Sequence, residues 1–154
     1  MHDEPTPSPA APAATPVDAP ARTRSAGAVA APLVIVADDN PYMRWLVRAT
    51  FRGRFEDIVE AGDGRELFWH LLRASRTRAE SEVIVIADIR MPVCSGLDVL
   101  ASFDELGYHP RTVVMTSYPD EQARASVAHV GGLLLPKPFS TEELRRVVEQ
   151  LWRK

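Results

Sequence analysis

The chain has 154 residues, of which 45% are hydrophobic and 25% charged, as in an ordinary globular protein. Its 18 basic and 21 acidic side chains give a net charge of -3, which argues against a strongly basic nucleic-acid-binding protein and a polybasic membrane-surface protein. One cysteine, Cys94, excludes an intramolecular disulfide and a cysteine-rich zinc site. The longest apolar run, 28–37, is broken by Pro32 and is too short to cross a bilayer. We therefore expect a cytoplasmic protein.

The first 32 residues differ in composition from the rest. They contain seven of the 13 prolines and ten alanines, but no aromatic residue. Such a segment cannot bury enough apolar surface to offset the entropy lost on ordering. We predict a disordered Pro/Ala-rich tail over 1–32 and one domain over 33–154.

From residue 33 on, short apolar runs alternate with helical patterns. The runs lie at 33–37, 83–87, 112–115 and 132–135, with a weaker one at 55–59. Continuous apolar runs, rich in Val and Ile in the two strongest cases, are typical of parallel strands buried on both faces.

Helices are predicted between these strands. The first follows Pro41, the second begins near Asp63, the third covers 96–106 and the fourth follows Pro119. The last begins at a Ser140–Glu143 capping box and carries apolar residues at helical spacing. This alternation predicts an open, doubly wound α/β sheet. Three arginines that end the second helix, at positions 73, 76 and 78, are expected to form a solvated face.

Polar residues follow four of the predicted strands, whose carboxyl ends should meet at one edge of the sheet. Asp38 and Asp39 follow the first strand and Asp88 follows the third, whereas Thr116 and Lys137 follow the fourth and fifth. Clustered carboxylates repel one another unless a cation neutralises them, and oxygen ligands suit Mg²⁺. A carboxylate such as Asp88 can also accept a phosphoryl group, with a lysine and a hydroxyl pairing with the phosphoryl oxygens.

Each of these residues also has an ordinary structural explanation. Asp38 and Asp39 could cap the first helix, and Asp88 could be a turn residue. Thr116 could simply end a strand, and Lys137 could be a solvated loop lysine. The combination favours a site, because 16 of the 18 basic residues are Arg and Lys137 is the one lysine before the final residue.

Five segments, in the same order, resemble the receiver domains of two-component response regulators. They are 33–41, 60–64, 88–92 with 96–97 after it, 115–117, and the Lys-Pro-Phe triplet at 137–139. The resemblance covers 33–154. It implies a flavodoxin-like (βα)5 fold around a central five-stranded parallel sheet of strand order 2-1-3-4-5. It also implies a cis peptide bond between Lys137 and Pro138, a bond that proline permits.

The resemblance further implies a role for each matching residue. Asp88 would be the phosphoacceptor. Asp39 would bind Mg²⁺ directly and Asp38 largely through water, and the backbone carbonyl of Arg90 would complete the metal site. The side chains that would bind the phosphoryl group are those of Lys137 and Thr116.

Three positions depart from the family pattern, one of them Ser117, which is small as is usual after the threonine but adds a hydroxyl. An aromatic residue commonly lies three residues before the lysine, and here that position is Leu134, so the coupling of an aromatic side chain to Thr116 is in question. Pro136 precedes Lys137, which suits an edge strand because proline has no N–H to donate.

Arg90 and Tyr118 each lie two residues after a site residue. In the family, such positions influence how long the phosphoryl group survives. We hypothesise that the two large side chains shield the aspartyl phosphate from water. The alternative is that both simply face solvent.

We expect a stand-alone, single-domain response regulator, because only 14 residues follow Ser140 and leave no room for a DNA-binding module. It would take its phosphoryl group from a histidine kinase or a histidine phosphotransfer protein and signal by protein–protein contact. We expect no direct contact with nucleic acid or membrane. The expected target surface comprises the helix after Pro119, strand 132–135 and the last helix. Its expected polar members are Arg124, Arg145, Arg146 and Glu149. Whether phosphorylation drives homodimerisation is left open.

Two other functions fit parts of the pattern. A phosphorylation-independent adaptor would keep the fold, and Leu134 leaves this alternative open. An aspartate-nucleophile phosphatase of the haloacid-dehalogenase type would need a second Asp two residues after Asp88, where this chain has Arg90. We therefore expect a phosphoacceptor that assists its own phosphorylation and dephosphorylation, not an enzyme acting on other molecules.

Overall fold

A computed structural model describes residues 31–152, so residues 1–30 of the predicted tail lie outside the described part of the chain. The elements, in chain order, are β1 (Leu33–Ala37), α1 (Pro41–Thr50), β2 (Asp57–Ala61), α2 (Gly64–Thr77), a short 3-10 helix η1 (Glu80–Glu82), β3 (Val83–Asp88), α3 (Gly96–Glu105), β4 (Arg111–Thr116), α4 (Glu121–His129), β5 (Leu133–Pro136) and α5 (Thr141–Trp152).

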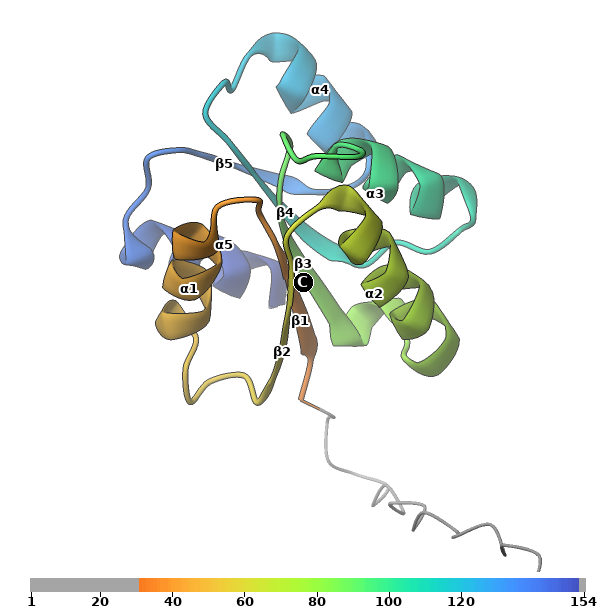
Figure 1. Ribbon diagram of the computed structural model, residues 1–154, viewed down its shortest axis with the longest axis horizontal. Coiled ribbons are helices and arrows are strands. Elements are labelled where there is room, and N and C mark those ends of the chain that lie inside the picture. The colour runs from red at the N-terminus through yellow and green to blue at the C-terminus, as the bar shows by residue number, and fades with distance from the viewer. Residues whose placement is uncertain (1–30, 153–154) are drawn as a thin grey trace, which may run out of the picture.

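The five strands form one parallel sheet in the order β2-β1-β3-β4-β5, which confirms the predicted fold. Helices α1 and α5 cover one face, and α2, α3 and α4 cover the other (Figure 1). Each face has its own apolar core, because the fully buried strands β1 and β3 send alternate side chains to opposite sides. Parallel pairing brings the carboxyl ends of all the strands to one edge.

The prediction for β2 was wrong by two residues. The strand covers Asp57–Ala61 instead of 55–59, and Leu33 of β1 pairs with Asp57. Phe55 is buried, but it packs in the turn after α1, where its ring centroid lies 5.3 Å from that of Phe51. Its apolar character therefore belongs to the connection and not to the strand.

Arg78 also differs from the prediction of a solvated arginine face. Its guanidinium lies 2.5 Å from the Asp57 carboxylate at the start of β2, and it donates to the Ala31 carbonyl at 3.3 Å. Arg73 and Arg76 are exposed as predicted. Arg78 therefore ties the end of α2 to the edge strand.

Strand β5 forms the other edge of the sheet, as Pro136 indicated, and covers Leu133–Pro136, one residue later than the run expected at 132–135. The Lys137 amide donates to the Thr116 carbonyl at 2.7 Å, so the Pro136 nitrogen, one residue earlier, faces the open side. The Lys137–Pro138 peptide is cis, which confirms that expectation. Within residues 31–152, no helix combines the length and apolarity needed to span a membrane.

Candidate functional site

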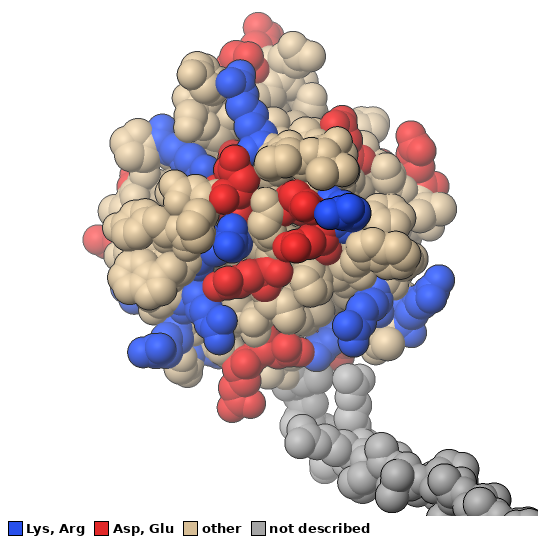
Figure 2. Space-filling view, viewed as in Figure 1, with Lys and Arg blue, Asp and Glu red and all other residues tan. Residues whose placement is uncertain are grey.

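Three carboxylates gather at the carboxyl edge of the sheet. Asp38 and Asp39 follow β1 and Asp88 ends β3, and one oxygen of each lies within 4.8 Å of the others. Asp38 and Asp88 are buried, whereas Asp39 is exposed. In the space-filling view, acidic side chains gather over the middle of the face, with basic ones between them (Figure 2). The predicted acidic cluster is therefore present.

Lys137 reaches this cluster from the end of β5. Its Nζ lies 2.7 Å from Asp38 Oδ2 and 3.5 Å from Asp88 Oδ2. Burial raises the pKa of Asp88 above its ordinary value, and the nearby Asp38 charge adds to the rise. The Lys137 ammonium and the backbone N–H of Arg90 act in the opposite direction on this pKa. The two buried acids thus share one ammonium group.

The backbone and side chain of Asp38 are held by four contacts. Its N–H donates to the Ala61 carbonyl at 3.1 Å, and its own carbonyl accepts from Arg44 Nη1 at 2.8 Å. The carboxylate accepts from the Asn40 N–H at 2.9 Å and from Lys137. Asn40, not the acid pair, caps α1, because its Oδ1 accepts from the Tyr42 N–H. The capping explanation for the two aspartates is therefore wrong.

Thr116 lies at the end of β4 with its side chain buried. Its Oγ1 accepts from the Tyr118 N–H at 3.0 Å, which leaves the hydroxyl hydrogen to donate. A cavity of about 180 Å³ opens beside it between α4 and the loops that follow β3 and β4. Thr116, Arg90 and Tyr118 are among the residues that line it.

Arg90 and Tyr118 come from two different loops and meet beside the cavity that Thr116 also lines. The guanidinium carbon of Arg90 lies 4.2 Å from the centroid of the Tyr118 ring, which is a cation–π distance. Both side chains are exposed to solvent on their remaining sides. The Arg90 carbonyl as a metal ligand and the shielding of a phosphoryl group both stay predictions.

Two glycines fix the loop that follows Asp88 at the end of β3. A Cβ added to Gly96 would lie 2.2 Å from the Asp88 carbonyl oxygen, and one added to Gly64 would lie 2.1 Å from the Cys94 carbonyl oxygen. Any larger residue at these positions would displace the β3–α3 loop or the start of a helix.

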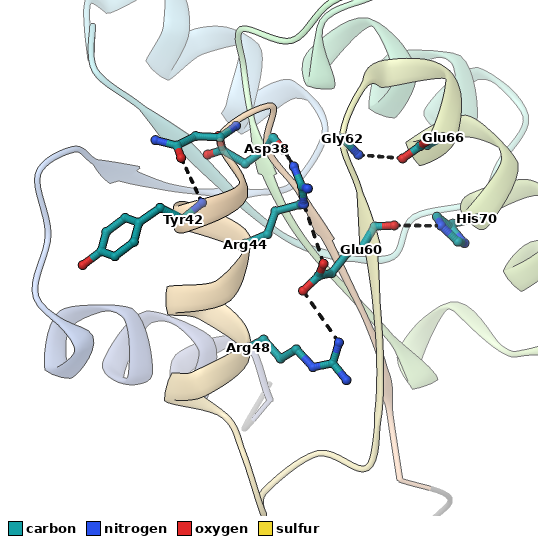
Figure 3. Close-up of polar contacts among 9 residues, drawn as sticks. Asp38, Tyr42, Arg44, Arg48, Glu60, Gly62, Glu66 and His70 are labelled. Atoms are coloured by element: carbon teal, nitrogen blue, oxygen red, sulfur yellow. Dashed lines mark hydrogen bonds and ion pairs between the residues drawn. The ribbon is translucent and has the colours of Figure 1, made fainter.

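The sequence analysis missed Arg44 and Glu60 as neighbours of the site. In Figure 3, Arg44 and Arg48 extend from α1 toward Glu60 on β2, whereas Tyr42 points away on the other side of α1. The spacing of Arg44 and Arg48 by one helical turn was a usable signal for a shared acidic partner.

The polar residues of the predicted target surface differ in their contacts within the chain. Arg124 and Arg146 are exposed on α4 and α5. However, Arg145 donates to the Thr50 carbonyl at 3.3 Å and Glu149 lies 2.5 Å from Arg54, so both contact the chain around α1. Arg145 and Glu149 thus lie where α5 packs beside α1, and the target surface stays a prediction. Leu134 is partly buried and packs into the core under α2, α3 and α4.

The fold and the site define a doubly wound α/β protein with an acidic cluster and a facing lysine at the carboxyl edge of a parallel sheet. Residues 34–149 match the family model of the response regulator receiver domain. The chain therefore belongs to the receiver domain family of two-component response regulators.

Three similar proteins illustrate the family. The DNA-binding transcriptional regulator NtrC of Salmonella typhimurium is 31% identical over 77% of this chain and 24% of NtrC. The probable methanogenesis regulatory protein FilR2 of Methanothrix harundinacea is 29% identical over 77% of this chain and 79% of FilR2. The response regulator TrrA of Thermotoga maritima, solved in complex with Mg²⁺-BeF, is 25% identical with a TM-score of 0.64, over 78% of this chain and 98% of TrrA. The chain spans about a quarter of the NtrC length.

Proposed function

We propose that this receiver accepts a phosphoryl group on Asp88 in a reaction that needs Mg²⁺, and that the phosphorylated form binds a target protein. One observation carries the proposal. The Asp88 carboxylate lies within 4.8 Å of two other carboxylates and 3.5 Å from the Lys137 ammonium. A nucleophilic carboxylate, a cation site and a lysine thus meet at one point.

The residues present fit a magnesium ion. The cluster offers oxygen atoms only, and Mg²⁺ prefers one or two carboxylates together with waters and phosphate oxygens. The complex of TrrA with Mg²⁺-BeF supports the same assignment for this chain. Asp39 and Asp88 would hold the ion directly, with Asp38 largely through water and the Arg90 carbonyl as a further ligand. Bound Mg²⁺ would neutralise part of the charge on the carboxylates and on the phosphoryl oxygens.

The phosphoryl donor we propose is a phosphohistidine of a kinase or a phosphotransfer protein. An oxygen of Asp88 attacks the phosphorus, a P–O bond forms, the P–N bond breaks, and the electron pair of that bond stays on the leaving imidazole nitrogen. Lys137 pairs with one phosphoryl oxygen and the Thr116 hydroxyl donates to another. Positioning and charge neutralisation carry most of such a transfer.

We further propose that the receiver works as a stand-alone module whose target binds α4, β5 and α5. The exposed Arg124 and Arg146 are its charged contacts there. The match covers 79% of FilR2, so in that relative the matched region makes up most of the protein. This supports a stand-alone receiver here. In this proposal the chain is a phosphoacceptor located in the cytoplasm, and it does not turn over other phosphate esters.

The test is an intact-mass measurement after incubation with acetyl phosphate, with and without Mg²⁺. The wild-type chain should gain the mass of one phosphoryl group only when Mg²⁺ is present. The Asp88→Asn variant should gain none. Asp98→Asn, which changes an exposed aspartate outside the cluster, is the matched control and should react like the wild type.

A gain that persists in Asp88→Asn would contradict the assignment of the phosphoacceptor. No gain with acetyl phosphate would move the test to phosphorylated histidine kinases. Failure with those donors as well would favour the phosphorylation-independent adaptor. Release of phosphate from a small phosphate ester with repeated turnover would favour the phosphatase.

A further inference from the structure

Arg44 makes a contact that the site described above does not use. It lies on α1, and its Nη1 donates to the backbone carbonyl of Asp38 at 2.8 Å. That carbonyl belongs to the peptide unit that joins Asp38 to Asp39. Because a peptide unit is planar, holding its oxygen fixes the direction in which the chain leaves for Asp39.

The remaining contacts of Arg44 are poorer. Its Nε lies 3.7 Å from Glu60 Oε2, which is an ion-pair distance but too long for a hydrogen bond. This Nε is buried and has no hydrogen-bond partner within residues 31–152. The guanidinium therefore makes its better contact with the Asp38 carbonyl and a longer one with Glu60 (Figure 3).

The carbonyl that Arg44 holds lies between two acids of the cluster. Three carboxylates gather beyond the carbonyl that it holds, and Lys137 is the cation that contacts two of them. The Arg44 side chain is only 20% exposed, so water screens its charge less than that of a surface arginine. Arg44 thus holds the peptide between the two acids from a largely buried position.

We propose that Arg44 is a positioning residue of the cation site, acting through the peptide between Asp38 and Asp39. This inference rests on the proposed function, because it assigns Arg44 to the metal site of the phosphorylation reaction. Partners that hold metal ligands in place commonly change metal affinity about 10- to 100-fold when removed. We expect the Arg44→Gln variant to bind the cation on the order of tenfold more weakly.

The experiment measures the affinity for Mn²⁺, a spectroscopic substitute for Mg²⁺, from the electron paramagnetic resonance signal of the free ion. Competition by Mg²⁺ then gives the Mg²⁺ affinity. The full chain is used, and circular dichroism verifies that each variant is folded at the temperature of the titration. This readout does not require phosphorylation, and a loss of global stability alone would not move it.

Arg48→Gln is the matched control. Arg48 lies one turn further along α1, and its Nη1 is 3.8 Å from the same Glu60, but the contacts described for it do not include Asp38. Its substitution removes an equal charge and should leave the affinity unchanged. If Arg44→Gln does not fold, Arg44→Lys replaces it, and its affinity should also fall because a single nitrogen cannot reach both the Asp38 carbonyl and Glu60.

Three outcomes are distinguishable. A selective loss of affinity in the Arg44 variant supports the inference. Equal affinities in the Arg44 and Arg48 variants overturn it while leaving the proposed function intact. A wild-type chain that binds no Mn²⁺, or binds it as well after Asp88→Asn, overturns the proposed metal site and this inference with it.

Discussion

The ammonium group of Lys137 lies closer to the buried Asp38 carboxylate, at 2.7 Å, than to the proposed phosphoacceptor Asp88, at 3.5 Å. The lysine thus pairs mainly with Asp38, which follows β1 and is fully buried. In this arrangement the cluster is neutralised in part by the protein itself. Metal binding and the lysine should therefore act on the same charges.

We predict that Lys137→Met destabilises the metal-free protein by about 3 kcal/mol, because removing one partner of a buried ion pair leaves the other charge uncompensated. Added Mg²⁺ should recover more stability in this variant than in the wild type, since the ion takes over the missing charge. Urea unfolding in EDTA and in Mg²⁺ measures both effects. Lys137→Arg, which keeps the charge, is the control. An equal gain from Mg²⁺ in all three proteins would contradict the prediction.

The stack of Arg90 on Tyr118 predicts how long the phosphoryl group survives. If the stacked pair shields the aspartyl phosphate from water as we predict, Arg90→Ala and Tyr118→Ala should each speed the loss of phosphate from Asp88. The double variant should be no faster than the faster single variant, since two partners of one contact are not additive. Release of phosphate after removal of the donor gives the rates. Tyr42→Ala, which removes an exposed aromatic ring pointing away from the site, should keep the wild-type rate.

The close contact at the start of α3 predicts the effect of a single methyl group. Gly96→Ala should destabilise the protein by about 1–3 kcal/mol, because its Cβ meets the Asp88 backbone and forces the loop to move. It should also slow phosphorylation of Asp88. Gly62→Ala is the control, because there the nearest atom to a new Cβ is 3.6 Å away. Chemical unfolding measures the stability, and equal losses in the two variants would show that the contact is not tight.

Tyr108 predicts a loss of stability at alkaline pH. Burial, aided by the charges of Glu80 and Glu82 and opposed by that of Arg78, raises its pKa from 10.0 to about 12. A folded-state pKa above the unfolded value means that the stabilising contribution is complete below pH 10.0 and is lost as pH rises toward about 12. In this window the unfolded chain releases the phenol proton and the folded chain retains it.

Tyr108→Phe removes the titrating group and should abolish this part of the alkaline loss. At neutral pH the variant should gain up to about 1 kcal/mol, because the Tyr108 hydroxyl is buried without a hydrogen-bond partner inside the described range 31–152. Urea unfolding across the alkaline range measures both. Tyr42→Phe, at a ring that is 63% exposed, serves as the control and should lose stability like the wild type. Indistinguishable pH profiles for Tyr108→Phe and the wild type would refute the prediction.

Sequence reasoning located the fold and the acidic cluster for the same physical reason. The strands β1 and β3 are buried on both faces, so their apolar runs are continuous and their ends are easy to recognise. Residues directly after parallel strands meet at one edge whatever their distance along the chain. Asp38, Asp88 and Lys137 could therefore be brought together without a structure.

Features that depend on packing between helices could not be predicted in this way. Strand β2 is an edge strand with half-buried polar residues, so Phe55 in the preceding turn gave a stronger apolar signal than the strand itself. Arg145 and Glu149 contact the chain around α1 because α5 lies beside α1 on the same face of the sheet. The periodicity of a helix does not show which helix will lie beside it. The contact of Arg44 with a backbone carbonyl left no trace in the residue pattern.

Pro136 has a consequence for contacts between copies of this chain. A strand at the edge of a sheet exposes unpaired N–H groups, onto which a further strand can add and extend the sheet. The nitrogen of Pro136 faces that open side and carries no hydrogen, so an incoming strand finds one bond fewer at the end of β5 nearest the acidic cluster. The edge at β5 is therefore a poorer template for the backbone ladder by which sheets grow into fibrils.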